Sequence, residues 1–117
     1  MYRNAGINRV FLTGVIENDV NLEMLRNNPD NIYFSILTSE TFVKNGKQVE
    51  HLEHHKIVMP TYIAKPDLQY FKKGALISIE GKMTTYLFTD DENIKRYNVE
   101  ILVTRYHWLT GLNVNKN

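Results

Sequence analysis

Apolar and polar residues alternate along most of this chain. Over residues 7–16, Val10, Leu12, Gly14 and Ile16 share one side, and a glycine inside such a run indicates a bend or a close approach of two backbones. Because a period of two sends successive side chains to opposite faces, each alternating run predicts a β-strand. The strands predicted in this way cover residues 7–16, 31–39, 53–59, 75–88 and 96–108.

Residues 18–30 interrupt the alternation with a polar segment. Val20, Leu22 and Met24 still alternate with polar neighbours, which allows a short strand in this segment. The Asn-Asn-Pro-Asp run at residues 27–30 then predicts a turn.

Two further segments predict hairpin connections. Residues 41–49 are expected to form a loop or hairpin around Asn45-Gly46, because Asn-Gly is the strongest two-residue turn signal. Residues 89–95 are charged and are expected to form the loop between the last two strands. Three adjacent acids in this loop are expected to be solvated, since metal-dependent nuclease sites need carboxylates that converge from separate elements.

A short helix is predicted between the third and fourth strands. It is expected to begin near Pro66, since proline suits the first helical turn, and to end before Gly74. Lys72 and Lys73 would then lie in its last turn, where cations favour the helix dipole. Phe71 would face the core.

Five strands with one helix between the third and fourth form the element order of a five-stranded oligonucleotide/oligosaccharide-binding (OB) barrel, an all-β fold. Residues 1–112 are expected to form this domain, and residues 113–117 a short polar end. In the fifth strand, one face is expected to carry Tyr97, Val99, Ile101 and Val103, and the other Leu102, Tyr106 and Trp108. Apolar residues on both faces of the first and last strands indicate an outer face covered by another subunit.

Composition narrows the function classes. The chain has 117 residues, no cysteine and a net charge of +1, so thiolate metal sites and disulfides are excluded and one domain is expected. The near-neutral charge gives little support for nucleic-acid binding by itself. No apolar run approaches a membrane span and no secretory signal is visible, so a cytoplasmic location is expected.

Histidines at positions 51, 54 and 55 raise the question of a metal site. His54 and His55 are neighbours on a predicted strand and therefore point to opposite faces. A zinc site needs three or four converging ligands, so no metal and no cofactor are expected. The chain also lacks phosphate-binding loops and nucleophile motifs, which argues against an enzyme.

The fourth predicted strand carries an unusual polar face. Its members are Glu80, Lys82, Thr84, Tyr86 and Phe88. Charges and flat rings on one face suit a ligand with phosphates and bases, which means a nucleic-acid strand. The alternative is a pair of cross-strand aromatics that only stabilise a hairpin.

Six segments in order and spacing make the chain resemble a known family. They lie at residues 6–14, 34–40, 53–58, 70–74, 79–82 and 96–101. Together they resemble the bacterial single-stranded DNA-binding protein (SSB) family, which includes mitochondrial forms, over about residues 6 to 112. The resemblance implies an OB barrel that binds single-stranded DNA without catalysis and assembles as a homo-oligomer, a tetramer being favoured and a dimer possible.

The resemblance also implies a set of DNA-binding residues. Phe42, His54 and Phe88 stand where the family often has tryptophan, and Tyr62 lies near a fourth aromatic position. The expected set also takes in the matching basic positions, lysines beside the strands, and residues of the polar face of the fourth strand. The full nucleic-acid-binding set is Arg3, Phe42, Lys44, His54, Lys56, Tyr62, Lys73, Lys82, Tyr86, Phe88 and Arg96.

Two departures from the family pattern stand out. No stacking position is tryptophan, and the sole tryptophan, Trp108, is expected to lie away from the groove. The chain ends Asn113-Val114-Asn115-Lys116-Asn117, without the acidic tip that recruits replication and repair proteins in the family. It is therefore expected to be either truncated or naturally tail-less.

The expected role is protection of single-stranded DNA in replication, recombination and repair, in the nucleoid-associated cytoplasm. One alternative is a tail-less relative that serves primosome, plasmid or phage replication and also binds protein partners. Another is an OB barrel used only for protein interaction or for oligosaccharide binding.

Overall fold

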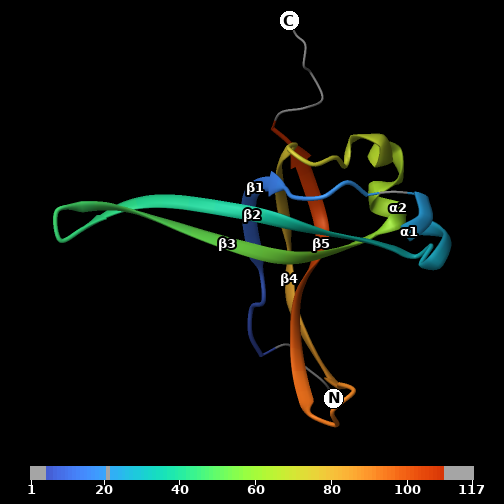
Figure 1. Cartoon of the computed structure of the whole chain (residues 1–117). Helices are drawn as coiled ribbons and strands as arrows, with labels where there is room; N and C mark the ends of the chain where they lie inside the picture. The colour runs from blue at the N-terminus through green and yellow to red at the C-terminus, as the bar shows by residue number, and fades with distance from the viewer. Residues whose placement is uncertain (1–4, 21, 110–117) are drawn as a thin grey trace, which may run out of the picture.

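The computed structural model describes residues 5–20 and 22–109, and these residues form a closed five-stranded barrel (Figure 1). The strands follow the order β1-β2-β3-β5-β4 around the barrel, and β1 pairs with β4 to close it. All pairs are antiparallel except β3 with β5. The strands are β1 (Val10–Ile16), β2 (Asn31–Lys44), β3 (Lys47–Pro60), β4 (Leu76–Thr89) and β5 (Lys95–Trp108). The predicted OB architecture is therefore confirmed.

The hairpin of β2 and β3 extends far beyond the barrel as an arm (Figure 1). Of the two forms predicted for residues 41–49, a loop or a hairpin, the structure has the hairpin, because both strands continue with 14 residues each up to a two-residue turn. The predicted turn at Asn45-Gly46 is confirmed, and both residues have positive φ angles, 53° and 77°. These angles match the twist of a tight hairpin.

The β4–β5 hairpin forms a second arm, which leaves the barrel in another direction (Figure 1). Residues 90–94 connect its strands, close to the predicted loop. Asp90 organises this connection, since its carboxylate accepts hydrogen bonds from the backbone amides of Glu92 (3.0 Å) and Ile94 (2.9 Å).

Residues 22–27 form a helix, α1 (Leu22–Asn27), so the short strand that the alternation of Val20, Leu22 and Met24 allowed is wrong. Glu23 in its first turn and Arg26 in its last turn both complement the helix dipole. Two apolar residues spaced two apart can belong to a helical turn as well as to a strand, which explains the error.

Two short helical turns lie between β3 and β4: α2 (Thr61–Ala64) and the 3₁₀ helix η1 (Lys65–Tyr70). The predicted helix was placed too far along the chain, because Lys72 and Lys73 lie in the turn after Tyr70. Phe71 is fully buried, as predicted. Neither these turns nor any other helix among the described residues is both long and apolar enough to cross a lipid bilayer.

The barrel interior is apolar and tightly packed. Its buried side chains include Ile16, Ile32, Phe34, Ile36, Ile57, Met59, Phe71, Ile77, Ile79, Ile101 and Val103. The predicted close approach at Gly14 is confirmed, because a Cβ atom there would clash with the backbone carbonyl of Leu37 and the side chain of Ile36. Only glycine lets β1 and β2 cross at this distance.

A β-bulge in β5 changes the face on which its last residues lie. Glu80 pairs with Arg105, whereas Gly81 pairs with Val103, so Thr104 is the extra residue. The predicted placement of Tyr106 and Trp108 opposite to Val103 is therefore wrong. The bulge turns both aromatic side chains inward, toward the same side as Val103.

These two aromatics complete a buried cluster around Phe71. The ring centroid of Phe71 lies 5.5 Å from that of Tyr106 and 4.8 Å from that of Trp108, both in edge-to-face geometry. The Tyr106 hydroxyl (2.7 Å) and the Trp108 indole N–H (3.0 Å) donate to the same carboxylate oxygen of Asp67. Burial, and then the hydrogen bond to Asp67, raise the pKa of Tyr106 well above its usual range.

Candidate nucleic-acid interface

Three neighbouring strands present polar and aromatic side chains on the side away from the core, which we call the outer face. Strand alternation places there His54 and Lys56 of β3, Arg96 and Asn98 of β5, and Lys82 and Phe88 of β4. The Lys56 ammonium donates to the Asn98 side-chain oxygen at 2.9 Å, which joins β3 to β5. Phe88 and Arg96 are direct cross-strand partners, which joins β5 to β4.

Arg96 is held beside Phe88 by the loop at the end of the second arm. Its Nε atom donates to Asp90 Oδ2 at 2.8 Å. This bond, followed by those from the amides of the loop, holds the pKa of Asp90 below its usual range. The Phe88 side chain is 44% exposed. A flat ring with an adjacent guanidinium is an arrangement on which a nucleobase can stack while its phosphate is neutralised.

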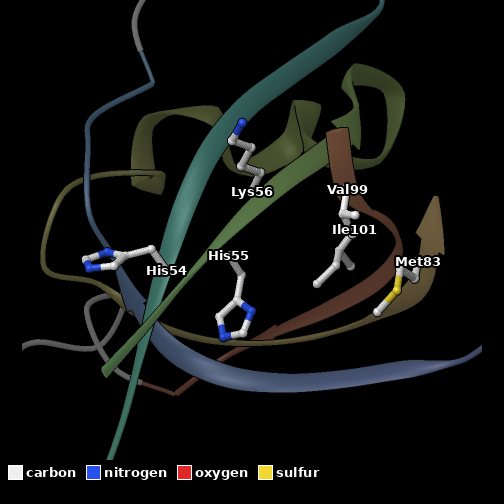
Figure 2. A pocket seen from close by; sticks show the side chains of 6 residues that line it. All are labelled: His54, His55, Lys56, Met83, Val99 and Ile101. Carbon is white, nitrogen blue, oxygen red and sulfur yellow. The ribbon is translucent and has the colours of Figure 1, made fainter. Parts of the chain in front are cut away.

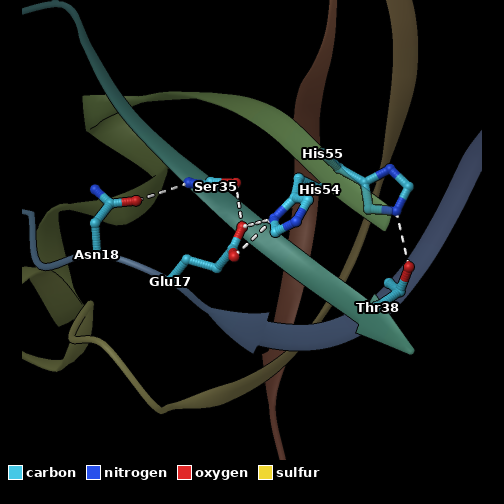
Figure 3. A network of polar contacts seen from close by, with 6 residues as sticks. All are labelled: Glu17, Asn18, Ser35, Thr38, His54 and His55. Atoms are coloured by element: carbon cyan, nitrogen blue, oxygen red, sulfur yellow. Dashed lines mark hydrogen bonds and ion pairs between the residues drawn. The ribbon is translucent and has the colours of Figure 1, made fainter. Parts of the chain in front are cut away.

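His54 is fixed by a carboxylate that the sequence reasoning missed (Figure 3). Its Nδ1 atom lies 2.8 Å from Glu17 Oε2 and 3.0 Å from Oε1. Since an ionised carboxylate only accepts hydrogen bonds, Nδ1 must carry the proton that is donated to Glu17. The second ring nitrogen, Nε2, can then contact a ligand. The His54 side chain is 66% exposed, so the ring also offers a face to solvent.

Glu17 is itself held by β2 (Figure 3). The Ser35 hydroxyl donates to Glu17 Oε1 at 2.6 Å, and the Glu17 amide donates to the Ser35 carbonyl at 2.9 Å. The Ser35 amide donates to the Asn18 side chain at 3.1 Å. The hydrogen bonds from Ser35 and then His54 hold the pKa of Glu17 below its ordinary value, so this group is anionic at neutral pH.

A cavity of about 230 Å³ is lined by side chains of β3, β4 and β5 (Figure 2). His54, His55, Lys56, Met83, Val99 and Ile101 line it. His54 and His55 point in different directions, and the His55 ring contacts the Thr38 hydroxyl at 2.9 Å (Figures 2 and 3). Within residues 5–20 and 22–109, no three histidine, aspartate or glutamate side chains gather where they could hold a metal ion.

Other predicted site residues lie elsewhere. Phe42 and Lys44 are on the first arm, and alternation along β2 puts them on the face opposite to Leu37, the cross-strand partner of His54. Tyr62 is an exposed residue of α2, which follows the C-terminal end of β3. The turn of the first arm lies at the opposite end of β3. A single chain therefore does not bring these three residues onto the outer face.

The remaining predicted residues fall outside the outer face or outside the described structure. Lys73 lies in the turn before β4, where its backbone amide donates to an Asp19 carboxylate oxygen at 2.7 Å. Arg3 lies outside the described residues. The backbone of Tyr86 belongs to β4, but its side chain is not among those described.

The structure adds an aromatic residue that the sequence reasoning assigned to the core side. Tyr97 faces Leu87 across the second arm and is 75% exposed. Alternation gave its face correctly, but the arm extends past the barrel, so this face has no core to cover it. No signal in the sequence marks the point where the barrel ends and the arm begins.

Comparison with known proteins identifies related sequences. Residues 7–109 match the Single-strand binding protein family. Two proteins named single-stranded DNA-binding protein, from serogroup A and serogroup B strains of Neisseria meningitidis, are each 33% identical over 110 residues. The alignment covers 93% of this chain and 63% of each relative, so the chain spans less than two thirds of their length.

Solved structures with the same fold are also known. Plasmodium falciparum SSB, solved in complex with single-stranded DNA, has a TM-score of 0.79 at 18% identity, covering 93% of this chain and 100% of that chain. A deletion mutant of the single-stranded DNA binding protein from Thermus aquaticus has a TM-score of 0.72 at 19% identity, covering 92% of this chain and 52% of that chain. These likenesses support the OB fold. Because the family match extends over most of its length, this chain belongs to the Single-strand binding protein family.

Proposed function

We infer that this protein binds single-stranded DNA without altering it chemically and with little regard to sequence. The observation that carries the proposal is the outer face, where Lys56, Arg96 and Phe88 are linked across three strands. The names of the Neisseria relatives and the DNA complex of the Plasmodium protein support the same ligand.

The proposed mechanism divides the work between charges and rings. Lys56, Lys82 and Arg96 neutralise phosphates, which gives affinity independent of sequence. Phe88 and His54 present flat faces for bases, and each stacked base contributes about 1–3 kcal/mol. The proposed path crosses β4, β5 and β3 in turn.

The remaining predicted residues are proposed to act where the strand leaves the outer face or where a second subunit approaches. This group contains Arg3, Phe42, Lys44, Tyr62, Lys73 and Tyr86. A homo-oligomer, a tetramer or else a dimer, agrees with the exposed apolar side chain of Phe11 on β1. Light scattering of the purified protein would measure this state.

The proposed cellular role is protection of single strands during DNA replication, recombination and repair in the cytoplasm. A tail-less relative that serves a primosome, plasmid or phage would bind DNA through the same face and would differ in its protein partners.

The test is a titration of a labelled oligo(dT) followed by fluorescence anisotropy at two salt concentrations. We expect binding that weakens as salt rises, and we expect Phe88→Ala to weaken it by about 1–3 kcal/mol. Leu87→Ala is the matched control, because Leu87 is an exposed neighbour on the opposite face of β4. Failure to bind any single-stranded oligonucleotide at low salt would overturn the proposal and favour a barrel used for protein interaction.

A further inference from the structure

A second groove lies beside the outer face, between the end of β1, the middle of β2 and the turn before β4. It has a volume of about 310 Å³ and is lined by Val15, Ile16, Glu17, Leu37, Lys73 and Gly74. Val15 is 37% exposed although it is apolar, and the half-buried Leu37 lies beside it. The groove thus has an apolar floor, an ammonium group at one position and a carboxylate at another.

The register of the sheet makes this groove continuous with the outer face. His54 on β3 is the cross-strand partner of Leu37 on β2, and Leu37 is the partner of Val15 on β1. Cross-strand partners point to the same side of a sheet. A DNA strand that contacts His54 therefore meets the groove floor as its next neighbour.

The chemistry of the groove selects what occupies it. Ionised Glu17 can accept about four hydrogen bonds, and the contacts from Ser35 and His54 leave acceptor capacity on Oε2. Those two contacts also fix the direction of the carboxylate. A group that meets this carboxylate must donate a hydrogen bond, whereas a carbonyl oxygen placed there is repelled.

Lys73, the cation that lines the groove, suits the phosphate of a nucleotide. Lys73 follows η1 in a turn that the carboxylate of Asp19 holds through the Lys73 amide. Its ammonium group can neutralise a phosphate beside a base that lies on Val15 and Leu37.

We propose that this groove is a subsite for one nucleobase with an exocyclic amino group, which donates to Glu17 while an adjacent phosphate meets Lys73. The inference rests on the proposed single-stranded DNA binding and adds a local base preference to it. Cytosine and adenine offer amino groups on their pairing edges, and glutamate accepts from the cytosine amino group in known base contacts. Uracil and thymine present a carbonyl oxygen at the equivalent position.

The experiment compares labelled oligo(dC) and oligo(dU) of equal length at neutral pH. These bases differ at position 4, which carries an amino group in cytosine and a carbonyl oxygen in uracil, and at N3, which carries a hydrogen only in uracil. A homopolymer guarantees which base enters the groove. We expect Glu17→Gln to reduce the preference for oligo(dC), changing the ratio of the two Kd values by about fivefold or more. The reason is that a glutamine amide can accept from cytosine or donate to uracil equally well.

Two control variants separate base recognition from charge. Glu23→Gln removes an exposed negative charge on α1, outside the groove, and we expect an unchanged Kd ratio. Lys73→Gln is expected to weaken both oligonucleotides to the same extent. Circular dichroism checks that each variant is folded.

A measurement on the unaltered protein covers the case in which Glu17→Gln does not fold. An oligonucleotide of N4,N4-dimethylcytosine has no amino hydrogen, and we expect it to lose the advantage of oligo(dC) over oligo(dU). Binding of both homopolymers with a Kd ratio that Glu17→Gln leaves unchanged overturns the subsite alone. Binding of neither homopolymer overturns the proposed function as well.

Discussion

Lys56 is the residue whose charge tests the outer face most directly. It lies where β3 meets β5, and its ammonium group bonds to Asn98. Lys56→Gln removes the charge while keeping a polar side chain of moderate length at this exposed position. If Lys56 neutralises a phosphate, the substitution must change how DNA affinity depends on salt, and not only the affinity itself.

The expected magnitude follows from counting the proposed phosphate contacts. The outer face and the groove beside it supply four: Lys56, Lys73, Lys82 and Arg96. At about 0.7 for each contact on a single strand, the log-log salt slope is about −2.8 per chain, which is about a fiftyfold loss of affinity for a fourfold rise in salt. Lys56→Gln should bring the slope to about −2.1 and the loss to about twentyfold.

The assay is anisotropy of labelled oligo(dT) at four or more salt concentrations. Lys65→Gln serves as the matched control, because Lys65 is an exposed lysine of η1 outside the proposed path. A slope that stays the same in Lys56→Gln, or that falls equally in Lys65→Gln, would refute the reasoning. The first result would remove Lys56 from the interface, and the second would show that only net charge matters.

Three further predictions concern stability. Asp67→Ala leaves two partly buried aromatic donors without their acceptor and should cost about 1–3 kcal/mol in urea unfolding, whereas Asp67→Asn keeps an oxygen and should cost less; equal stability of all three proteins would contradict this. Deleting Thr104 removes only the extra residue of the bulge, so Arg105 still pairs with Glu80 and the last aromatics stay inward beside Ile77 and Ile79. It should cost only about 1 kcal/mol, for the hydrogen bond from the Thr104 hydroxyl to the Glu80 carbonyl, and leave tryptophan emission unshifted; a red shift would count against the register. Because the pKa of Glu17 is lower in the folded protein, ionised Glu17 stabilises the fold at pH values above its ordinary pKa of 4.5. This contribution is lost as the pH falls through the lower pKa of Glu17 in the folded protein. The difference in unfolding free energy between the wild type and Glu17→Gln should therefore be complete at pH 7 and shrink in strong acid, and a constant difference would be inconsistent with it.

Strand alternation predicted the parts of the fold that surround the core. Ile77 and Ile79 are buried as their spacing required, and Gly14 sits at the expected close crossing. The first arm was shortened in the prediction because neighbours such as Glu40 and Thr41, which point to opposite faces of the hairpin, are both exposed. Without a core on one side, a strand carries no apolar period to read.

The sequence allowed a site residue to be predicted only where its role does not depend on strand length or on a partner distant in the sequence. Phe88 and Lys56, which belong to the DNA-binding set that the family resemblance implied, both lie on the outer face. Phe42 does not join them, because the parity of a long strand decides its face, and the length of that strand was missed. Glu17 was not found, since its contact with His54 spans 37 residues of sequence and appears only when β1 and β3 are placed around the barrel.

The pairing of β3 with β5 is short, with register partners only at Ile57–Ile101 and Val58–Leu102 among the described residues. The two long hairpins therefore meet along a narrow seam, and the Lys56–Asn98 bond lies beside it. A polynucleotide lying across both hairpins would contact both sides of this seam and hold them together. DNA binding would therefore stabilise the closed barrel, and amide hydrogens at the seam should exchange more slowly once DNA is bound.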